Sequence, residues 1–201
     1  NSLGLENLFL AYQIYTKIDQ NAIKKDKLLT VGTEQISVDN CLSKILQENH
    51  SGCIAALVSE IGENNLKQFL KDQSYTNTNF TSHLTNTADL LSLSKRLNTH
   101  PDFSEQLWQE FRTKLTPQDN SKNPLLTGFS KLTVYGLFGA QTNDVTNANL
   151  SYPLFNNLYF LETKQEDPKD RQTFVLISLA SDIDAASLIE LAKNIESAIL
   201  E

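Results

Sequence analysis

Ser51 and Ser130 are two candidate nucleophiles in this chain. Ser51 directly follows His50, and Ser130 is a second candidate nucleophile further along the 201-residue chain. A serine hydroxyl becomes a useful nucleophile when a neighbouring base takes its proton. One hypothesis is therefore an enzyme in which Ser51 or Ser130 attacks a carbonyl, with His50 nearby.

The three histidines do not indicate a metal site. His50, His83 and His100 are not at metal-ligand spacing, and no cluster of cysteines or acids stands beside them. We expect ordinary surface or loop histidines, and neither a metal nor a cofactor.

Cys41 and Cys53 are the only cysteines, twelve positions apart. One falls in the first turn of an expected helix and the other at the start of the next helix. Such helix starts can lie within the Cα separation of about 4.4–6.8 Å that a disulfide requires. From the residues alone, a disulfide and a pair of reduced core cysteines both remain open.

Composition excludes several classes of protein. With 17 Lys and Arg against 24 Asp and Glu the net charge is −7, which does not support a phosphate-binding face for nucleic acid. No apolar run approaches the length of about 18 residues that a transmembrane helix needs. The N-terminal residues Asn1-Ser-Leu-Gly contain no basic segment or cleavage pattern, so no signal segment is visible in this chain. A hydrophobic fraction of 40% suffices for one good-sized core.

The first part of the chain is predicted to be helical. Residues 3–18 are apolar on nearly every side, which is typical of a helix buried in the centre of a domain. Ser37 is a helix N-cap, and the apolar spacing after it predicts a helix from about Val38 to Gln47. Apolar spacing predicts a helix over residues 54–61, followed by Gly62, and another helix whose apolar face is Leu66, Phe69 and Leu70. Residues 85–89 supply caps for a leucine-rich helix through Leu97. Asp102 or Ser104 caps a further helix, which carries Leu107, Trp108 and Phe111 and stops before Pro117.

The last part changes to strand patterns. Short β-branched and aromatic runs occupy residues 132–138, 158–163 and 173–179, and a final amphipathic helix follows a cap at Asp182 or Asp184. Segregated helices and strands favour an α+β fold. We expect one domain over residues 1–201. Its helical part covers about 1–117, and three antiparallel strands with a packed C-terminal helix cover about 130–201.

Several segments carry a family resemblance. The helical part resembles that of class A β-lactamases and penicillin-recognising D,D-peptidases, and residues 134–200 are similar to the C-terminal part of that family. The matching segments are 7–20 (NLFLAYQIYTKIDQ), 28–31 (LLTV), 37–42 (SVDNCL), 55–62 (AALVSEIG) and 86–91 (NTADLL). The resemblance implies a β-lactamase/transpeptidase-like fold that lacks the family's first two sheet strands.

The resemblance also places the family's nucleophile motif, S-x-x-K, at the start of the first helix. The serine position holds Gly4 and the lysine position holds Asn7. In the family the serine attacks the lactam or peptide carbonyl and the lysine assists removal of its proton. Gly4 and Asn7 can do neither.

Two further motifs are altered at the aligned positions. The S-x-N motif aligns with Asn49-His50-Ser51, in which the hydroxyl and the amide have changed places. The K-T/S-G motif aligns with Leu137, Phe138 and Gly139, so only the glycine is retained. The Ω-loop region 75–85 contains no acid that could activate a deacylating water. We therefore expect no acyl transfer from the family's own positions.

The resemblance leads to two hypotheses on function. The first is a catalytically inactive β-lactamase-like domain, a pseudoenzyme that binds or scaffolds in the cell envelope. A cell-wall ligand or a protein partner would occupy its degenerate cleft. The alternative is a serine hydrolase of β-lactamase or D,D-peptidase type with relocated catalytic residues.

Members of this family are usually extracytoplasmic. This favours a disulfide between Cys41 and Cys53, and an oxidising, extracytoplasmic location. The absent sheet strands would come from upstream sequence or from another chain.

Overall fold

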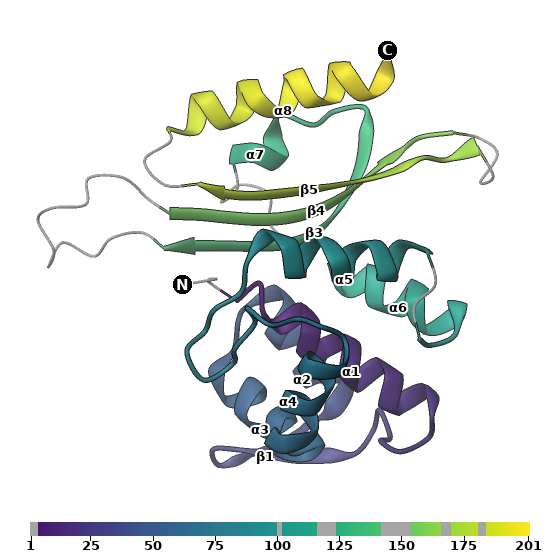
Figure 1. Ribbon diagram of the computed structural model, residues 1–201, viewed down its shortest axis with the longest axis vertical. Coiled ribbons are helices and arrows are strands. Elements are labelled where there is room, and N and C mark those ends of the chain that lie inside the picture. The colour runs from purple at the N-terminus through teal and green to yellow at the C-terminus, as the bar shows by residue number, and fades with distance from the viewer. Residues whose placement is uncertain (1–3, 100–101, 116–123, 142–153, 166–169, 181–183) are drawn as a thin grey trace, which may run out of the picture. The chain divides into compact units, whose positions relative to one another are not determined.

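A computed structural model describes residues 4–99, 102–115, 124–141, 154–165, 170–180 and 184–201 (Figure 1). The chain forms two compact units, which are residues 1–115 and 116–201. We call them the helical unit and the sheet unit and describe each by itself. The expectation of one domain over residues 1–201 stays a prediction.

The helical unit contains six helices and one short hairpin among its described residues. Ser37 accepts a hydrogen bond from the Asn40 backbone N–H, which caps α2 as the sequence predicts. The elements are α1 (Asn7–Asp19), β1 (Leu28–Val31), β2 (Glu34–Ser37), α2 (Val38–Gln47), α3 (Ser51–Ile61), α4 (Glu63–Asp72), α5 (Thr87–Thr99) and α6 (Glu105–Leu115).

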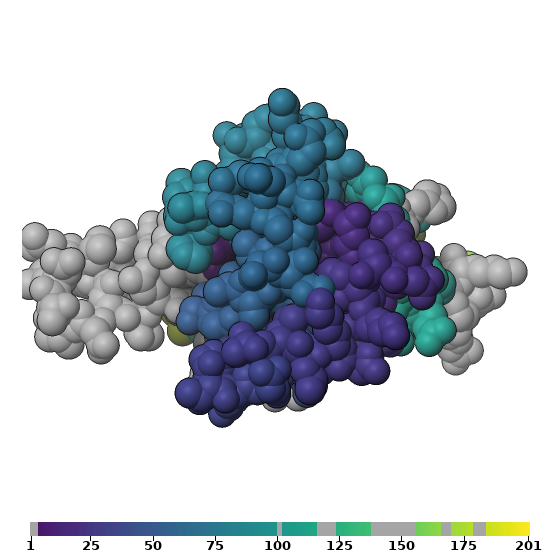
Figure 2. Space-filling model, turned by 90° about the horizontal axis from the view of Figure 1, so that it is seen from below, coloured from purple at the N-terminus to yellow at the C-terminus, as the bar shows by residue number. Residues whose placement is uncertain are grey.

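Helix α1 forms the centre of this unit. Its residues from Asn7 to Thr16 are all buried, as its apolar sequence predicts. The ring of Tyr15 makes edge contact with Phe111 of α6, and Phe9 makes edge contact with Tyr75. Figure 2 shows one side of the molecule, where purple residues near the N-terminus lie beside the blue residues that follow them in the chain. Helix α1 is therefore enclosed by the other elements of the helical unit.

The sheet unit has three antiparallel strands and a long helix. The strand order is β3 (Leu132–Gln141), β4 (Leu154–Thr163) and β5 (Thr173–Ala180), so β4 is central. A short helix, α7 (Pro124–Thr127), precedes β3, and α8 (Ala185–Leu200) follows β5. Asp184 caps α8 by accepting a hydrogen bond from the Ser187 backbone N–H. The predicted α+β class, with three C-terminal strands and a C-terminal helix, is confirmed.

One face of this sheet packs against α7 and α8. Tyr159 and Leu161 of β4 form a buried cluster with Leu188 and Ala192 of α8. On β4 the side chains alternate between faces, so Leu158 and Phe160 point to the opposite face. Burial raises the pKa of the Tyr159 phenol, as expected for a core tyrosine. No helix in the described ranges has the length and apolarity to cross a bilayer.

Candidate functional site

Gly4 occupies the turn that begins α1. Its backbone φ is +96°, a conformation that favours glycine, and its carbonyl accepts a hydrogen bond from the Asn7 N–H. A Cβ at this position would lie 2.7 Å from Cγ of Asn49. The Asn49 side chain therefore occupies the space into which a side chain at residue 4 would project.

Asn7 fixes Asn49 in this place. Its Nδ2 donates hydrogen bonds to Oδ1 of Asn49, at 2.8 Å, and to the backbone oxygen of Ile45, at 3.1 Å. Asn7 is buried, and among the described residues its Oδ1 has no hydrogen-bond partner. We call Gly4, Asn7 and Asn49 the amide cluster. The structure thus brings together three of the residues that the resemblance assigned to catalytic positions.

The disulfide lies next to the amide cluster in the chain. Cys41 of α2 and Cys53 of α3 are bonded, with their Cα atoms 5.1 Å apart, and both are fully buried. The bond closes the loop that carries Asn49 and His50. The predicted disulfide is confirmed.

His50 acts as the N-cap of α3. Its Nδ1 accepts a hydrogen bond from the Cys53 backbone N–H at 3.1 Å. Ser51, the first residue of α3, is exposed and makes no hydrogen bond with His50, both residues lying in the described part of the chain. Nδ1 of His50 is therefore already engaged in capping α3.

Ser130 lies in the sheet unit and is held by Glu196 of α8. The Ser130 hydroxyl donates to Oε2 of Glu196 at 2.9 Å, and the backbone N–H groups of Ser130, Lys131 and Leu132 donate to Oε1. We call these four residues the Glu196 clasp. Burial raises the pKa of Glu196, but the backbone and hydroxyl hydrogen bonds outweigh it, and the pKa is lowered overall. A carboxylate with a lowered pKa is a poor general base for the Ser130 hydroxyl.

The aligned K-T/S-G positions lie in β3. Leu137 is buried and pairs with Leu158 of β4, while Phe138 and Gly139 pair with Asn157 and Asn156. The side chain of Phe138 lies outside the described residues. The role assigned to these three positions stays a prediction.

A buried acid, Glu6, contacts residues 75–85, the region that aligns with the Ω loop and contains no acid. Glu6, adjacent to Asn7, contacts Nδ1 of His83 through its Oε1 at 3.0 Å. His83 was expected to be an ordinary loop histidine, and its side chain is indeed largely exposed, but it joins the loop to the start of α1. No local pattern predicts this contact, because 77 positions separate the two residues.

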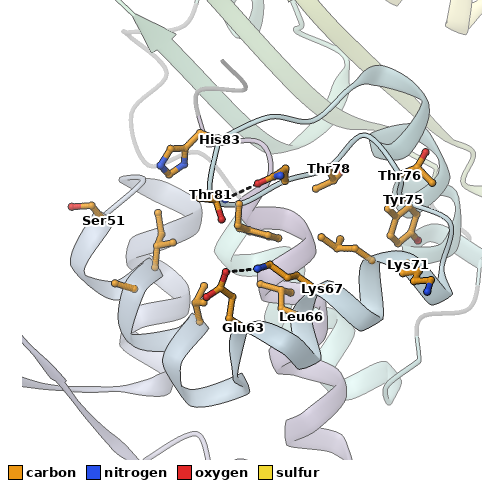
Figure 3. A pocket seen from close by; sticks show the side chains of 16 residues that line it. Ser51, Glu63, Leu66, Lys67, Lys71, Tyr75, Thr76, Thr78, Thr81 and His83 are labelled. Atoms are coloured by element: carbon orange, nitrogen blue, oxygen red, sulfur yellow. Dashed lines mark hydrogen bonds and ion pairs between the residues drawn. The ribbon is translucent and has the colours of Figure 1, made fainter.

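A pocket of about 670 Å³ lies between α3, α4 and the loop that follows α4 (Figure 3). Apolar residues of the two helices line it, and Tyr75, Phe80 and several threonines come from the loop. Burial raises the pKa of the Tyr75 phenol, with a smaller opposing effect from the Arg96 cation. None of the amide-cluster residues lines this pocket. Within the described ranges, no group of histidines, cysteines or acids could hold a metal ion.

Comparison with known proteins identifies the fold. No protein-family model matches the chain, and no curated protein matches it in sequence. Solved structures do match. A β-lactamase from Xanthomonas campestris pv. campestris has a TM-score of 0.74 at 11% identity, and the match covers 98% of this chain and 82% of that one.

Two further structures agree with this match. A β-lactamase from Burkholderia vietnamiensis has a TM-score of 0.75 at 13% identity, covering 98% of this chain and 82% of that one. The last common ancestor of Gram-negative bacteria class A β-lactamase has a TM-score of 0.75 at 15% identity, covering 98% and 84%. The fold is β-lactamase-like, as the resemblance implied.

Proposed function

We propose that this protein is a catalytically inactive β-lactamase-like module of the cell envelope, which binds a cell-wall ligand or a protein partner without forming an acyl-enzyme. The observation that carries the proposal is the position of the Asn49 side chain, 2.7 Å from where a Cβ of residue 4 would stand. Gly4 has no nucleophile, and the space for one is taken. Loss of the nucleophile in a catalytic triad typically lowers kcat by about six orders of magnitude.

The neutral amides of the cluster support the same conclusion. An acyl transfer needs a group that takes the proton from the nucleophile. The nitrogen of an amide is not such a base, and Asn7 already donates from this nitrogen to Asn49 and Ile45. The amide cluster is built to hold two chain segments together rather than to move a proton.

The envelope location is supported by the Cys41–Cys53 disulfide. Disulfides persist in oxidising, extracytoplasmic compartments and are rare in the cytosol. The solved structures that the chain resembles in fold are those of β-lactamases.

The relocated serine hydrolase is the competing function. It requires a base for Ser51 or Ser130. Nδ1 of His50 is used by the Cys53 N–H, and the Ser130 hydroxyl is bonded to a carboxylate of lowered pKa. No geometry at either serine favours this alternative.

Covalent labelling separates the two functions. The purified protein is incubated with a fluorescent penicillin and its intact mass is measured, with an active class A β-lactamase as the positive control. We expect no adduct and no hydrolysis of a chromogenic cephalosporin. An adduct that is lost in Ser51→Ala or Ser130→Ala would overturn the proposal in favour of the relocated serine hydrolase.

A further inference from the structure

The pocket beside α3 and α4 is a candidate ligand site separate from the amide cluster. Six of its lining residues, from two helices and the loop, have pure hydrocarbon side chains. They are Ile54, Ala55, Val58, Leu66, Leu70 and Phe80. A volume of about 670 Å³ is within the range of about 300–1,000 Å³ that small-molecule sites occupy. A largely apolar lining favours a ligand that binds by burial of hydrocarbon.

The loop that roofs this pocket is held by hydrogen bonds to Asp89 of α5 and by hydrogen bonds within the loop. Oδ2 of Asp89 accepts from the Asn77 N–H and from the Thr78 hydroxyl, both at 2.9 Å. The Asn79 side chain accepts from the backbone N–H groups of Thr81 and Ser82, at 2.8 and 3.1 Å. The pocket is therefore preformed, which lowers the entropic cost of binding.

The apolar lining runs along both helices, because Ile54 and Val58 of α3, and likewise Leu66 and Leu70 of α4, lie one turn apart. Figure 3 shows Ser51 near one end and Lys71 with Thr76 at the other, with Leu66 and Lys67 between them. Two such rows of apolar side chains can flank a single hydrocarbon chain.

A cation stands at one end of this space. Lys67 is paired with Glu63 at 2.6 Å, so these two charges balance. Lys71 has no ion pair or side-chain hydrogen bond with any residue that the structure describes. An unpaired lysine at the rim of an apolar pocket attracts an anionic head group locally.

We propose that this pocket binds an anionic amphiphile with a single acyl chain, whose chain lies along Ile54, Val58 and Leu66 and whose carboxylate meets Lys71. The long apolar stem of Lys71 lets its ammonium group stay in water while it contacts the head group. The inference does not rest on the proposed loss of catalysis, because no amide-cluster residue lines the pocket.

Calorimetric titration of the whole chain with three probes of equal chain length tests the proposal. The probes are dodecanoate, dodecan-1-ol and dodecyltrimethylammonium, each below its micelle concentration. We expect dodecanoate to bind with one site per chain, and the cationic probe to bind at least about tenfold more weakly. Equal affinity for the three probes, or no binding of dodecanoate, would overturn the proposal.

Substitutions at two lining positions locate the site, and each has a matched control on α5. Ala55→Trp places an indole in the pocket and should abolish dodecanoate binding, whereas Ala88→Trp, on an exposed face of α5, should leave it unchanged. Lys71→Glu should weaken dodecanoate binding about tenfold, and Lys95→Glu on α5 should have little effect. Wild-type affinity in both Ala55→Trp and Lys71→Glu would place the binding elsewhere and contradict the inference.

Discussion

The amide cluster of the helical unit and the Glu196 clasp of the sheet unit hold distant chain segments by different means. In the amide cluster, neutral side chains join positions 42 residues apart, through Asn7 and Asn49. In the Glu196 clasp, one ionised carboxylate receives three backbone N–H groups and a hydroxyl from residues about 65 positions away. Both use residue types that also serve in catalysis.

This difference illustrates two ways in which polar side chains can stabilise a fold. The amide cluster acts mainly through packing, since the Asn49 side chain occupies the space beside Gly4. The Glu196 clasp acts mainly through electrostatics, since a carboxylate makes stronger hydrogen bonds than an amide does. The two should consequently respond differently to mutation and to pH.

The largest expected effect is that of Glu196→Ala. This change leaves the backbone N–H groups of Ser130, Lys131 and Leu132 without their acceptor, and we expect a loss of about 3 kcal/mol in the free energy of unfolding. Urea denaturation followed by circular dichroism measures it. Glu190→Ala, at an exposed position of α8, is the matched control and should change stability by less than about 0.5 kcal/mol. Similar losses in both variants would mean that the clasp does not stabilise the sheet unit.

The second effect tests the packing of the amide cluster. Gly4→Ala should cost about 2–3 kcal/mol, because it combines a positive φ with a Cβ placed against Asn49. Gly32→Ala is the matched control. Gly32 also has a positive φ, of 62°, but its Cβ would meet nothing within 4 Å, so about 1 kcal/mol is expected.

A double-mutant cycle isolates the contact with Asn49. In an Asn49→Ala background the cost of Gly4→Ala should fall towards that of Gly32→Ala, with a coupling energy of about 1 kcal/mol. Additive effects of the two changes would show that Asn49 does not fill the space beside Gly4.

The smallest effect is the dependence on pH. Hydrogen bonds lower the pKa of Glu196 in the folded chain, so its contribution to stability is fully present above the ordinary glutamate pKa of about 4.3 and is lost as the pH falls through the lower folded value. The stability difference between wild type and Glu196→Gln should therefore shrink in acid. Asp184 also has a lowered pKa, mainly through its hydrogen bonds with Ser187, but it is present in both proteins and cancels.

The matched comparison is with Asn49→Ala in the neutral cluster. Its stability difference from wild type should stay constant over the same pH range. Denaturant midpoints between pH 3 and pH 7, roughly the span over which a carboxylate titrates, measure both differences. An acid dependence for Asn49→Ala as strong as that for Glu196→Gln would contradict the distinction between the clusters.

Local signals made much of the fold predictable from sequence. Helix α2 begins and ends where the Ser37 cap and the apolar spacing predict, because both signals lie within the helix itself. The hairpin of β1 and β2 was not predicted as strands. Its strands are only four residues long, β2 shows no alternation of burial, and Leu28 at the start of β1 is exposed.

The site was predictable only where a family pattern related distant positions. Resemblance assigned Gly4, Asn7 and Asn49 to one site, and the structure places them in contact. The contacts of Glu6 and Glu196 were not predicted, because their partners lie far away in the chain and no local spacing indicates them. The pocket was missed for the same reason, because its wall joins two helices and a loop.

The order of the three-stranded sheet has a consequence for association. Strands β3 and β5 are the outer strands, and neither contains a charged residue along its length. Charged side chains on outer strands normally discourage pairing with another chain. We expect the free edge of β5 to accept an added strand, from upstream sequence or from another molecule, and to make concentrated solutions of the protein prone to self-association.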